Sequence, residues 1–504
     1  MRYLLPFLFL LSLTLLLLPG CEPKADIVTM DSNARLEFSQ DTVLFDTVFV
    51  RTGTATRRLW VYNRNPRAVR VEQITLANPG ASPYRLLVGG DAGPSINNVE
   101  IKGRDSLLVL VRATIDPTPG DAKPFLVTDE LRFRTNGNDQ QVALVAYGQN
   151  AYFHNGETLP CNTTWTNDKP HVIYNSVLVD SACTLTMQPG TRVYSHAGSI
   201  LIVAGTLRVN PGYQPGTDSV GANSESIVRF AGDRLEPFYD NIPGQWAGIQ
   251  FLASSHDNVV RYAEIKNAAY GLLLFNYRNR LPRPAVRVEN TVIRNISGQS
   301  INFASAAQTL PTGAGVLSLS GDVEMRNCLI TNCGEYAVLG VGGGNFTFDY
   351  CTIANYRGNF NRSTESLTLS NEAPSTVAKG PYLLRLTMRN SIVWGSLRDE
   401  LLLVNGTQYE QLTIRNSLLQ TERYKAATST ATVPGFGNGG NVLNQDPRFR
   451  RTPNLYPNRF DYRLGPESPA SNKAAPLPNL TRDLLNAPRD PRTPDMGAYE
   501  RAAP

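Results

Sequence analysis

Residues that commonly bind metals are scarce in this sequence. Only four of its 504 residues are histidines, and no two of its six cysteines form a CxxC pair. Protein zinc sites are built from Cys and His residues at short, characteristic spacings. We therefore predict no metal site, and no motif in the sequence indicates a cofactor.

Neither sign of charge is in large excess. The chain has 48 Lys and Arg residues against 43 Asp and Glu residues, for a formal net charge of +5. This excludes a strongly basic nucleic-acid-binding protein and an acidic disordered chain, so we expect no nucleic-acid partner. Beyond the first 20 residues, no apolar run is long enough to span a bilayer. What the chain does contain, 40 Gly and 34 Pro with 41% hydrophobic residues, indicates a folded protein with many turns and little long helix.

The first 20 residues have the pattern of an export signal. Arg2 precedes the almost entirely apolar run Leu4–Leu18, which is shorter than the roughly 20 residues that a spanning helix needs. The end of the segment resembles a bacterial lipoprotein signal, with the small residue Gly20 before Cys21. This resemblance implies that Cys21 is lipidated and anchors the protein to a membrane, and Glu22 favours the outer membrane. The alternative is a plain cleaved signal in which Cys21 has no role.

Disulfides are expected because an exported chain folds in an oxidising compartment. Cys161 and Cys183 are near each other in sequence, so we predict a bridge that closes a short loop. Cys328 and Cys351 occupy equivalent positions in the sequence repeats described below, which favours a stacked pair of thiols. A disulfide from Cys328 to Cys333 or to Cys351 is the alternative.

Short alternating apolar and polar runs, separated by turn residues, extend from about residue 35 to residue 150. The clearest runs are 43–51, 58–62, 69–76, 107–113, 130–134 and 141–146. This spacing predicts an antiparallel β-sandwich. The succession FDTVFV, LWVYNRN, LRFRTNG and VALVAYG resembles the immunoglobulin-like modules found beside larger bacterial surface domains. The resemblance implies a spacer or packing role, with a binding role as the alternative.

A six-residue motif recurs in the larger C-terminal part of the chain. Its pattern is apolar, polar, Asn or Tyr, small, apolar, apolar. The copies are Val288–Ile293, Met325–Ile330, Phe348–Ile353, Met388–Val393 and Ile414–Leu419, with a weaker one at Val260–Ile265. Successive copies begin 23 to 40 residues apart, which is typical of solenoid coils with loop insertions.

Further short β-runs follow the motif copies, with no helical period between them. These second strands are predicted at Gly271–Phe275, Ser300–Phe303, Tyr336–Val341, Ser366–Ser370 and Leu401–Asn405. One coil cannot bury its own apolar residues, but stacked coils share a continuous core. The pattern therefore predicts a right-handed parallel β-helix of roughly ten coils.

The Asn of the motif suits a sharp corner, because Asn tolerates the left-handed backbone conformation. The residues concerned are Asn290, Asn327, Asn390 and Asn416. If equivalent corners stack, their side chains can hydrogen-bond to one another as a ladder. We interpret them as structural corners rather than as a ligand groove.

The chain ends in the segments NVLNQDPRF, YRLGPESPASNKA and RDLLNAPRDPRTPDMGAYE. Together with the repeats, this ending resembles secreted bacterial β-helix proteins of the pectin-lyase-like superfamily, over about 340 residues. The segments CNTTWTNDKPHVIYNSVLVD and PGQWAGI resemble uncharacterised lipoproteins of Bacteroidetes-type bacteria. We expect the closing segment to cap an otherwise open end of the solenoid.

Many proteins of this superfamily degrade polysaccharides, but the motifs shared by polygalacturonase-like hydrolases are absent from the repeats. We therefore predict no catalytic residues. Three charged residues of the insertion NYRGNFNRSTES and two acids further along the chain define a possible ligand groove. They are Arg357, Arg362, Glu365, Asp399 and Glu400. Asp399 and Glu400 are a poor catalytic pair, because neighbours on a strand point to opposite faces.

The sequence thus predicts an all-β protein: an N-terminal immunoglobulin-like β-sandwich, then a right-handed parallel β-helix with a C-terminal capping segment. Its parts are a signal peptide (1–20), a tether (21–34), the sandwich (35–150), the β-helix (151–460) and the cap (461–504). We expect a lipid-anchored outer-membrane protein that binds a polysaccharide or a cell-envelope protein without catalysis. The alternative is a polysaccharide lyase or glycoside hydrolase with a non-standard active site.

Overall fold

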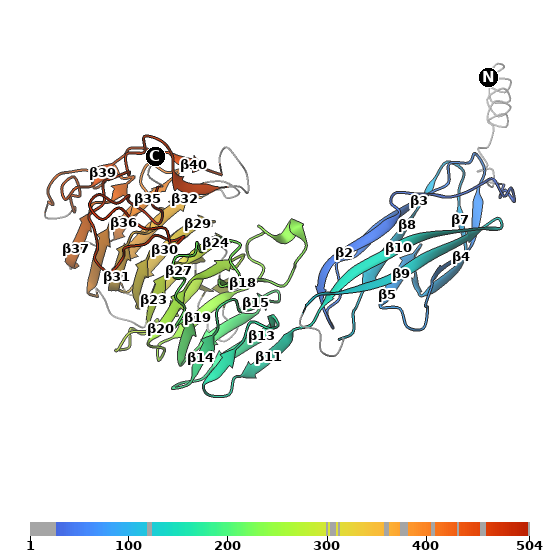
Figure 1. The fold of residues 1–504 in the computed structure, drawn as a ribbon, viewed down its shortest axis with the longest axis horizontal. Coiled ribbons are helices and arrows are strands. Elements are labelled where there is room, and N and C mark those ends of the chain that lie inside the picture. Colours follow the sequence, from blue (N-terminus) through green and yellow to red (C-terminus); the bar gives the residue numbers. More distant parts are fainter. Residues whose placement is uncertain are drawn as a thin grey trace, which may run out of the picture. The chain divides into compact units, whose positions relative to one another are not determined.

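The computed structural model divides the chain into two compact units, Met1–Gln149 and Asn150–Pro504 (Figure 1). The residues that it describes are 27–117, 123–298, 301–302, 309–310, 313–356, 362–372, 382–404, 409–430, 433–453 and 460–501. The predicted signal and Cys21 therefore lie outside the described residues. Within these residues, no helix is long and apolar enough to cross a membrane, and the helical segment η1 (Pro237–Tyr239) is a single 3-10 turn.

The first unit is a sandwich of two five-stranded sheets. One sheet has the order β1(Glu37–Phe38), β3(Arg57–Tyr62), β8(Ser106–Ala113), β5(Tyr84–Val88), β6(Asp91–Gly93). The other has the order β2(Thr42–Phe49), β10(Asn138–Gln149), β9(Phe125–Thr135), β4(Val69–Leu76), β7(Ser95–Ile101). Alternate side chains of both sheets are buried, and the rings of Phe45 and Tyr84 meet between the sheets with centroids 5.6 Å apart. One pair departs from the predicted antiparallel pattern, since β2 and β10 run parallel.

The second unit is a parallel β-helix with three faces. It opens with β11(Tyr152–Thr158) and β13(His171–Val179), and β13 pairs with the first strands of both face A and face B. Face A continues as β15(Arg192–Ser195), β18(Val228–Gly232), β21(Ala263–Lys266), β24(Val292–Ile296), β29(Leu329–Cys333), β32(Thr352–Asn355), β35(Ile392–Gly395), β38(Leu418–Leu419), β39(Val442–Leu443). Face B continues as β16(Ile200–Val203), β19(Gly248–Leu252), β22(Leu272–Phe275), β27(Ala314–Leu319), β30(Tyr336–Val341), β33(Leu367–Ser370), β36(Leu401–Val404).

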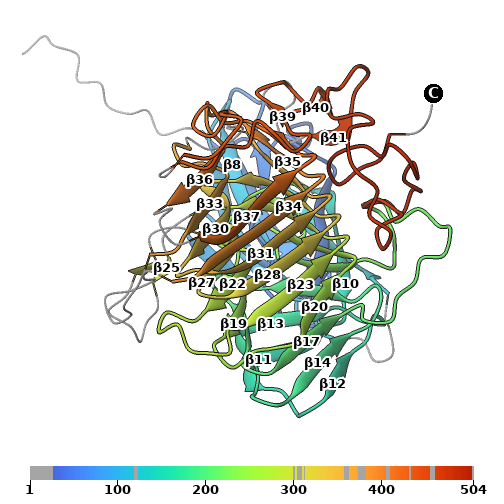
Figure 2. The same cartoon turned by 90° about the vertical axis from the view of Figure 1, so that its left-hand side faces the viewer.

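Face C is a separate nine-stranded sheet, and its strands are stacked one above another in Figure 2. It comprises β12(Thr163–Trp165), β14(Thr184–Met187), β17(Thr206–Val209), β20(Asn258–Arg261), β23(Ala285–Glu289), β28(Asp322–Arg326), β31(Gly344–Asp349), β34(Leu384–Arg389), β37(Tyr409–Arg415). From β14 to β38 the chain visits faces C, A and B in turn, and successive strands of each face pair in parallel from one coil to the next. The inward side chains of all three faces form one continuous apolar core.

The motif residues form the corners between face C and face A. Asn290, Asn327, Asn390 and Asn416 all have left-handed backbone conformations, with φ between 47° and 56°. Tyr350 takes the same conformation at the corner after Asn327, with φ of 52°. Arg326 pairs with Asp349 and Leu329 with Thr352, so positions 327 and 350 are vertical neighbours.

The corner Asn side chains do not bond to one another as a ladder would require. Their Nδ2 groups donate instead to backbone oxygens of the C-terminal segment. The pairs are Asn290 with Asp483, Asn327 with Arg482, Asn390 with Ala475 and Asn416 with Lys473. The reason is that these amides point outward, where the C-terminal segment offers acceptors. A true amide ladder lies at the corner between faces A and B, where Asn332 donates to Asn295 and Asn295 donates to Asn267.

The cysteines of the second unit comprise one disulfide-bonded pair and three free thiols. Cys161 and Cys183 form a disulfide, with Cα atoms 4.7 Å apart. Cys328, Cys333 and Cys351 are free and buried. Burial, together with the neighbouring Cys328 thiol, raises the pKa of Cys351 well above its usual value. The Cys351 thiol is therefore kept in the neutral form.

An insertion changes the coil that follows Asn290. The strand predicted at Ser300–Phe303 is not part of the helix: β25(Ile301–Asn302) pairs antiparallel with β26(Thr309–Leu310). The face B strand of this coil is β27, which pairs with β22 and β30. A short β-run in the sequence does not distinguish a hairpin in a loop from a strand of a coil.

The C-terminal segment, residues 460–501, runs along the side of the coils, and we call it the strap. It begins with β41(Asp461–Leu464), which pairs with β40(Phe449–Arg451). Its apolar side chains pack on the outward apolar side chains of face A in one buried cluster. The sequence predicted that this segment caps an open end of the stack. It covers the flank of the stack instead, where it is the dark red trace at the edge of the coils in Figure 2.

Two histidines, the buried His171 and the partly exposed His154, lie together in the first coil. His154 Nε2 is 3.0 Å from His171 Nδ1, and His154 Nδ1 is 2.5 Å from Glu157 Oε1. His171 Nε2 is 3.2 Å from the carbonyl oxygen of Thr166, and both imidazoles stack on the Trp165 indole. Burial lowers the pKa of both histidines, and it lowers the pKa of His171 to about 4 with help from the nearby His154.

These histidines predict acid sensitivity of the β-helix. In the unfolded chain His171 has a pKa near 6.5, so below that pH the unfolded state binds more protons than the folded state. The stability present above pH 6.5 is lost as the pH falls toward 4, by about 3 kcal/mol from this residue. Thermal unfolding of wild type and His171→Gln between pH 7 and pH 4.5 measures the effect, with His256→Gln as the control. Equal pH dependence in wild type and His171→Gln would contradict the prediction.

Candidate functional site

The groove residues predicted from the insertion do not form an open groove. Arg362 and Glu400 are fully buried and form a bidentate ion pair, with Nη2–Oε1 and Nη1–Oε2 distances of 2.7 and 2.8 Å. Glu400 also accepts hydrogen bonds from the backbone and hydroxyl of Ser366 and from the backbone of Leu397. This pair is therefore part of the interior and not available to a ligand. Arg357 lies outside the described residues.

The other two predicted groove residues have structural partners near the last coils. Glu365 is paired with Arg423, with Oε1 and Nη1 3.3 Å apart. Asp399 accepts hydrogen bonds from the Thr421 hydroxyl and from the backbone of Glu422 and Arg423. Burial would raise the pKa of Asp399, but these hydrogen bonds outweigh it and lower the pKa. The carboxylate holds a turn in place.

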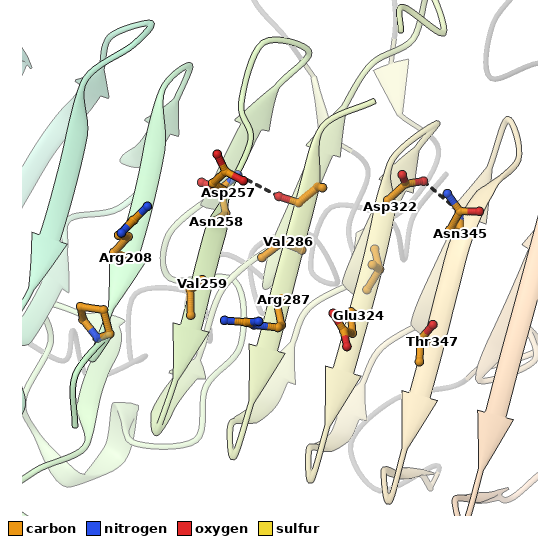
Figure 3. A pocket seen from close by; sticks show the side chains of 13 residues that line it. Arg208, Asp257, Asn258, Val259, Val286, Arg287, Asp322, Glu324, Asn345 and Thr347 are labelled. Carbon is orange, nitrogen blue, oxygen red and sulfur yellow. Dashed lines mark hydrogen bonds between the residues drawn. The ribbon is translucent and has the colours of Figure 1, made fainter. Parts of the chain in front are cut away.

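A shallow groove of about 890 Å³ lies instead on the outer surface of face C (Figure 3). Its lining comes from five neighbouring strands, β17, β20, β23, β28 and β31. On each of these strands alternate residues point into the core, for example Val323 and Met325 of β28, so the residues between them point outward. The groove is thus built from the outward positions of consecutive coils.

Parallel register aligns these outward residues into rows. The central row is Thr164, Thr186, Arg208, Val259, Arg287, Glu324, Thr347, Thr387 and Thr413. Adjacent members lie one strand spacing apart, about 4.8 Å. A ligand that lies along the helix axis therefore meets a new side chain of this row at each coil, and every one of them except Val259 is polar.

Charges of both signs line the groove. Arg208 and Arg287 supply cations, while Asp257, Asp322 and Glu324 supply carboxylates (Figure 3). Asp322 accepts a hydrogen bond of 2.9 Å from the backbone of Asn345. None of the three carboxylates is buried.

One edge of face C carries a second row of alternating charge. It consists of Arg261, Glu289, Arg326, Asp349, Arg389 and Arg415. Arg261 contacts Glu289 at 2.9 Å and Arg389 contacts Asp349 at 2.7 Å. Glu324 of the central row is held by Arg326. These ion pairs fix the edge of the groove, and the row keeps an excess of positive charge, because it has four arginines against two acids.

The two carboxylates of β28 that line the groove have fixed partners. In this groove Glu324 is paired with Arg326, and Asp322 has a backbone donor. The groove lining contains no aromatic residue, whereas aromatic side chains are typical of protein-binding hot spots. An array of hydroxyls, amides and mixed charges matches a polar, extended ligand.

Sequence reasoning missed this groove because no local motif marks it. Arg208 and Val259 are neighbours across β17 and β20, yet a long insertion separates them in the chain. Two features of the sequence could have indicated the groove. One is the alternation of apolar and polar residues within each face C strand, and the other is the register between coils that the Asn corners impose. Within the described residues, no group of three or more His, Cys, Asp or Glu side chains could hold a metal ion.

The topology places the chain in a broad class: all-β proteins that combine a sandwich with a parallel β-helix. No family model matches the sequence, and no curated protein matches it. A GH87 alpha-1,3-glucanase catalytic domain in complex with nigerose aligns over 72% of this chain and 91% of its own length, with 7% identity and a TM-score of 0.15.

Two other solved structures align with about a quarter of the chain. A PapD-like domain of human CEP192 aligns over 23% of this chain and 85% of its own length, with 10% identity and a TM-score of 0.16. A protein of unknown function from Porphyromonas gingivalis aligns over 25% of this chain and 59% of its own length, with 10% identity and a TM-score of 0.17. TM-scores this low carry no information about the activity of this chain.

Proposed function

We propose that this protein is a lipid-anchored cell-envelope protein whose β-helix binds an extended polysaccharide along face C without transforming it. The observation that carries the proposal is the groove of about 890 Å³, lined by outward polar side chains of consecutive coils. Sugar hydroxyls both donate and accept hydrogen bonds, and the groove offers guanidinium donors, carboxylate acceptors and the Thr347 hydroxyl. The repeat of the coils matches a ligand that is itself a linear repeat.

The anchor is supported by the sequence pattern that ends in Cys21. One acyl chain holds a protein at a membrane only marginally, whereas several chains give a stable anchor. Intact-mass measurement of the protein purified from membranes tests this part. A mass that carries acyl chains on Cys21 as the first residue is expected, and an unmodified Cys21 thiol would contradict it.

The binding prediction is tested with the soluble chain that starts at residue 22. Calorimetric titration against a panel of purified polysaccharides should give at least one ligand. The double variant Arg208→Ala, Arg287→Ala should bind that ligand at least tenfold more weakly, because a hydrogen bond to a charged group contributes about 1.5–3 kcal/mol. Arg58→Ala, an exposed arginine change in the sandwich, is the matched control. Equal affinity of the double variant and the control would contradict the assignment of the groove.

A polysaccharide-degrading enzyme is the second candidate function, favoured by one observation. Asp322 and Glu324 are alternate residues of β28 and both line the groove, so their Cα atoms are about 6.7 Å apart. Their side chains lie on the same face of the strand, which places two carboxyl groups beside one ligand, as most glycosidases require. Release of reducing ends or unsaturated products, lost in Asp322→Asn and Glu324→Gln, would replace the binding proposal with this one.

A further inference from the structure

A second hollow, of about 670 Å³, lies between face A and the strap, and we call it the flank pocket. Pockets of about 300–1,000 Å³ are typical of small-molecule sites. The lining of the flank pocket comes from sequence-distant segments, including β21, β24, the loop 220–222 and the strap. The pocket therefore exists only when the strap is docked on the coils.

An ion pair forms the floor of the flank pocket. Glu264 of β21 and Arg294 of β24 are largely buried, with Oε1 and Nε 2.8 Å apart. Arg294 also donates to the side-chain oxygen of Asn241 at 2.9 Å. Burial would raise the pKa of Glu264, but the Arg294 and Lys266 cations outweigh it and lower the pKa. The floor thus presents fixed, charged hydrogen-bonding groups.

The rest of the lining mixes polar and apolar side chains and includes an aromatic ring. Phe460 lies at the start of the strap, with the Arg294 guanidinium 6.0 Å from its ring centroid. The Phe460 ring is 5.3 Å from the ring of Tyr462, and Val292 and Leu484 also line the hollow. A ligand with a flat apolar face can pack on Phe460 while its polar groups reach the floor.

The charges that line the flank pocket balance. Three arginines, at 294, 451 and 463, face three acids, at 240, 264 and 461. Asp240 is paired with Lys266 and Asp461 with Arg463, both at 2.5 Å. A balanced wall gives no net attraction to an anion or a cation, but it offers both donors and acceptors. This favours an uncharged ligand that carries several hydroxyl groups.

We propose that the flank pocket binds a neutral mono- or disaccharide, held by its hydroxyls on the Glu264–Arg294 pair and by one ring face on Phe460. A ring face of a sugar is apolar and its edge is polar, which matches one aromatic wall above a polar floor. This site is separate from the face C groove and shares none of its residues. An experiment that contradicts sugar binding in the flank pocket can therefore be distinguished from one that contradicts polysaccharide binding on face C.

The test uses the soluble chain that starts at residue 22 and a panel of neutral sugars: glucose, galactose, N-acetylglucosamine, maltose, cellobiose and lactose. Saturation-transfer NMR detects binding, and calorimetric titration gives the affinity. Phe460→Leu removes the ring but keeps an apolar side chain, and should weaken binding about fivefold to tenfold. Phe238→Leu, at an exposed ring outside the pocket, is the matched control and should leave affinity unchanged.

Three results would overturn the proposal. One is that no sugar of the panel binds. The second is that Phe460→Leu binds as tightly as Phe238→Leu while both retain the wild-type circular dichroism spectrum. The third is that glucuronate, which carries a negative charge, binds more tightly than glucose. Binding that survives Arg208→Ala, Arg287→Ala but not Phe460→Leu would assign the sugar to the flank pocket.

Discussion

A chain that ends before residue 460 is expected to aggregate rather than fold into a soluble β-helix. The strap covers outward apolar side chains of face A, including Leu329, Ile392, Trp394 and Leu418. Without it, these residues form one continuous exposed apolar face, and such faces are associated with aggregation. The effect should be far larger than that of any single surface substitution.

Polar contacts of the strap add to this apolar cover. Arg489 is almost completely buried, and its guanidinium lies 3.9 Å from the ring centroid of Tyr350. It donates to Asn327 Oδ1 and to the carbonyl of Gly497, both at 3.0 Å. Asn390 and Ala475 exchange two hydrogen bonds, at 2.7 and 2.9 Å. Removal of the strap would leave these corner amides without their partners.

The measurement is the soluble fraction after expression, followed by size-exclusion chromatography of what remains soluble. A chain shortened only by residues 502–504 is the control and should behave as wild type. A milder variant, Ala498→Asp, places an unpaired charge at a fully buried position of the strap and should destabilise the fold by several kcal/mol. A monomeric, cooperatively unfolding chain without the strap would show that the coils are stable alone.

The coils could be predicted from sequence because their determinants are local. Asn327 and Asn390 occupy left-handed corners, and a left-handed residue is a property of one position. Strand β30 matches the predicted range Tyr336–Val341 for a similar reason, since a short apolar run is visible within a few residues. Intervals between motif copies then give the number of residues in each coil.

Contacts between distant segments could not be predicted in this way. The corner amide of Asn290 donates to Asp483, 193 residues later. Nothing near Asn290 distinguishes this partner from the next Asn in the stack. The same limit applies to Arg362 and Glu400. Both look like surface residues in the sequence, but they are buried and neutralise each other across 38 residues.

Replacement of Glu400 by Gln is expected to destabilise the β-helix by about 3–5 kcal/mol. The change keeps the shape of the side chain but leaves the Arg362 cation buried without a counter-charge. Glu400 also accepts hydrogen bonds of 3.1 and 2.5 Å from Ser366 and one of 2.8 Å from Leu397. A neutral amide accepts these bonds more weakly, and it offers Arg362 only one oxygen.

Urea unfolding followed by tryptophan fluorescence measures this loss, because Trp165, Trp246 and Trp394 all lie in the second unit. Glu467→Gln is the matched control, since Glu467 and its partner Arg448 are both exposed, and it should change stability by less than about 1 kcal/mol. Adding Arg362→Met to Glu400→Gln removes the unpaired cation and should recover part of the loss. If the double variant is no more stable than Glu400→Gln alone, the buried charge is not the cause, and the hydrogen bonds to Ser366 and Leu397 account for the effect.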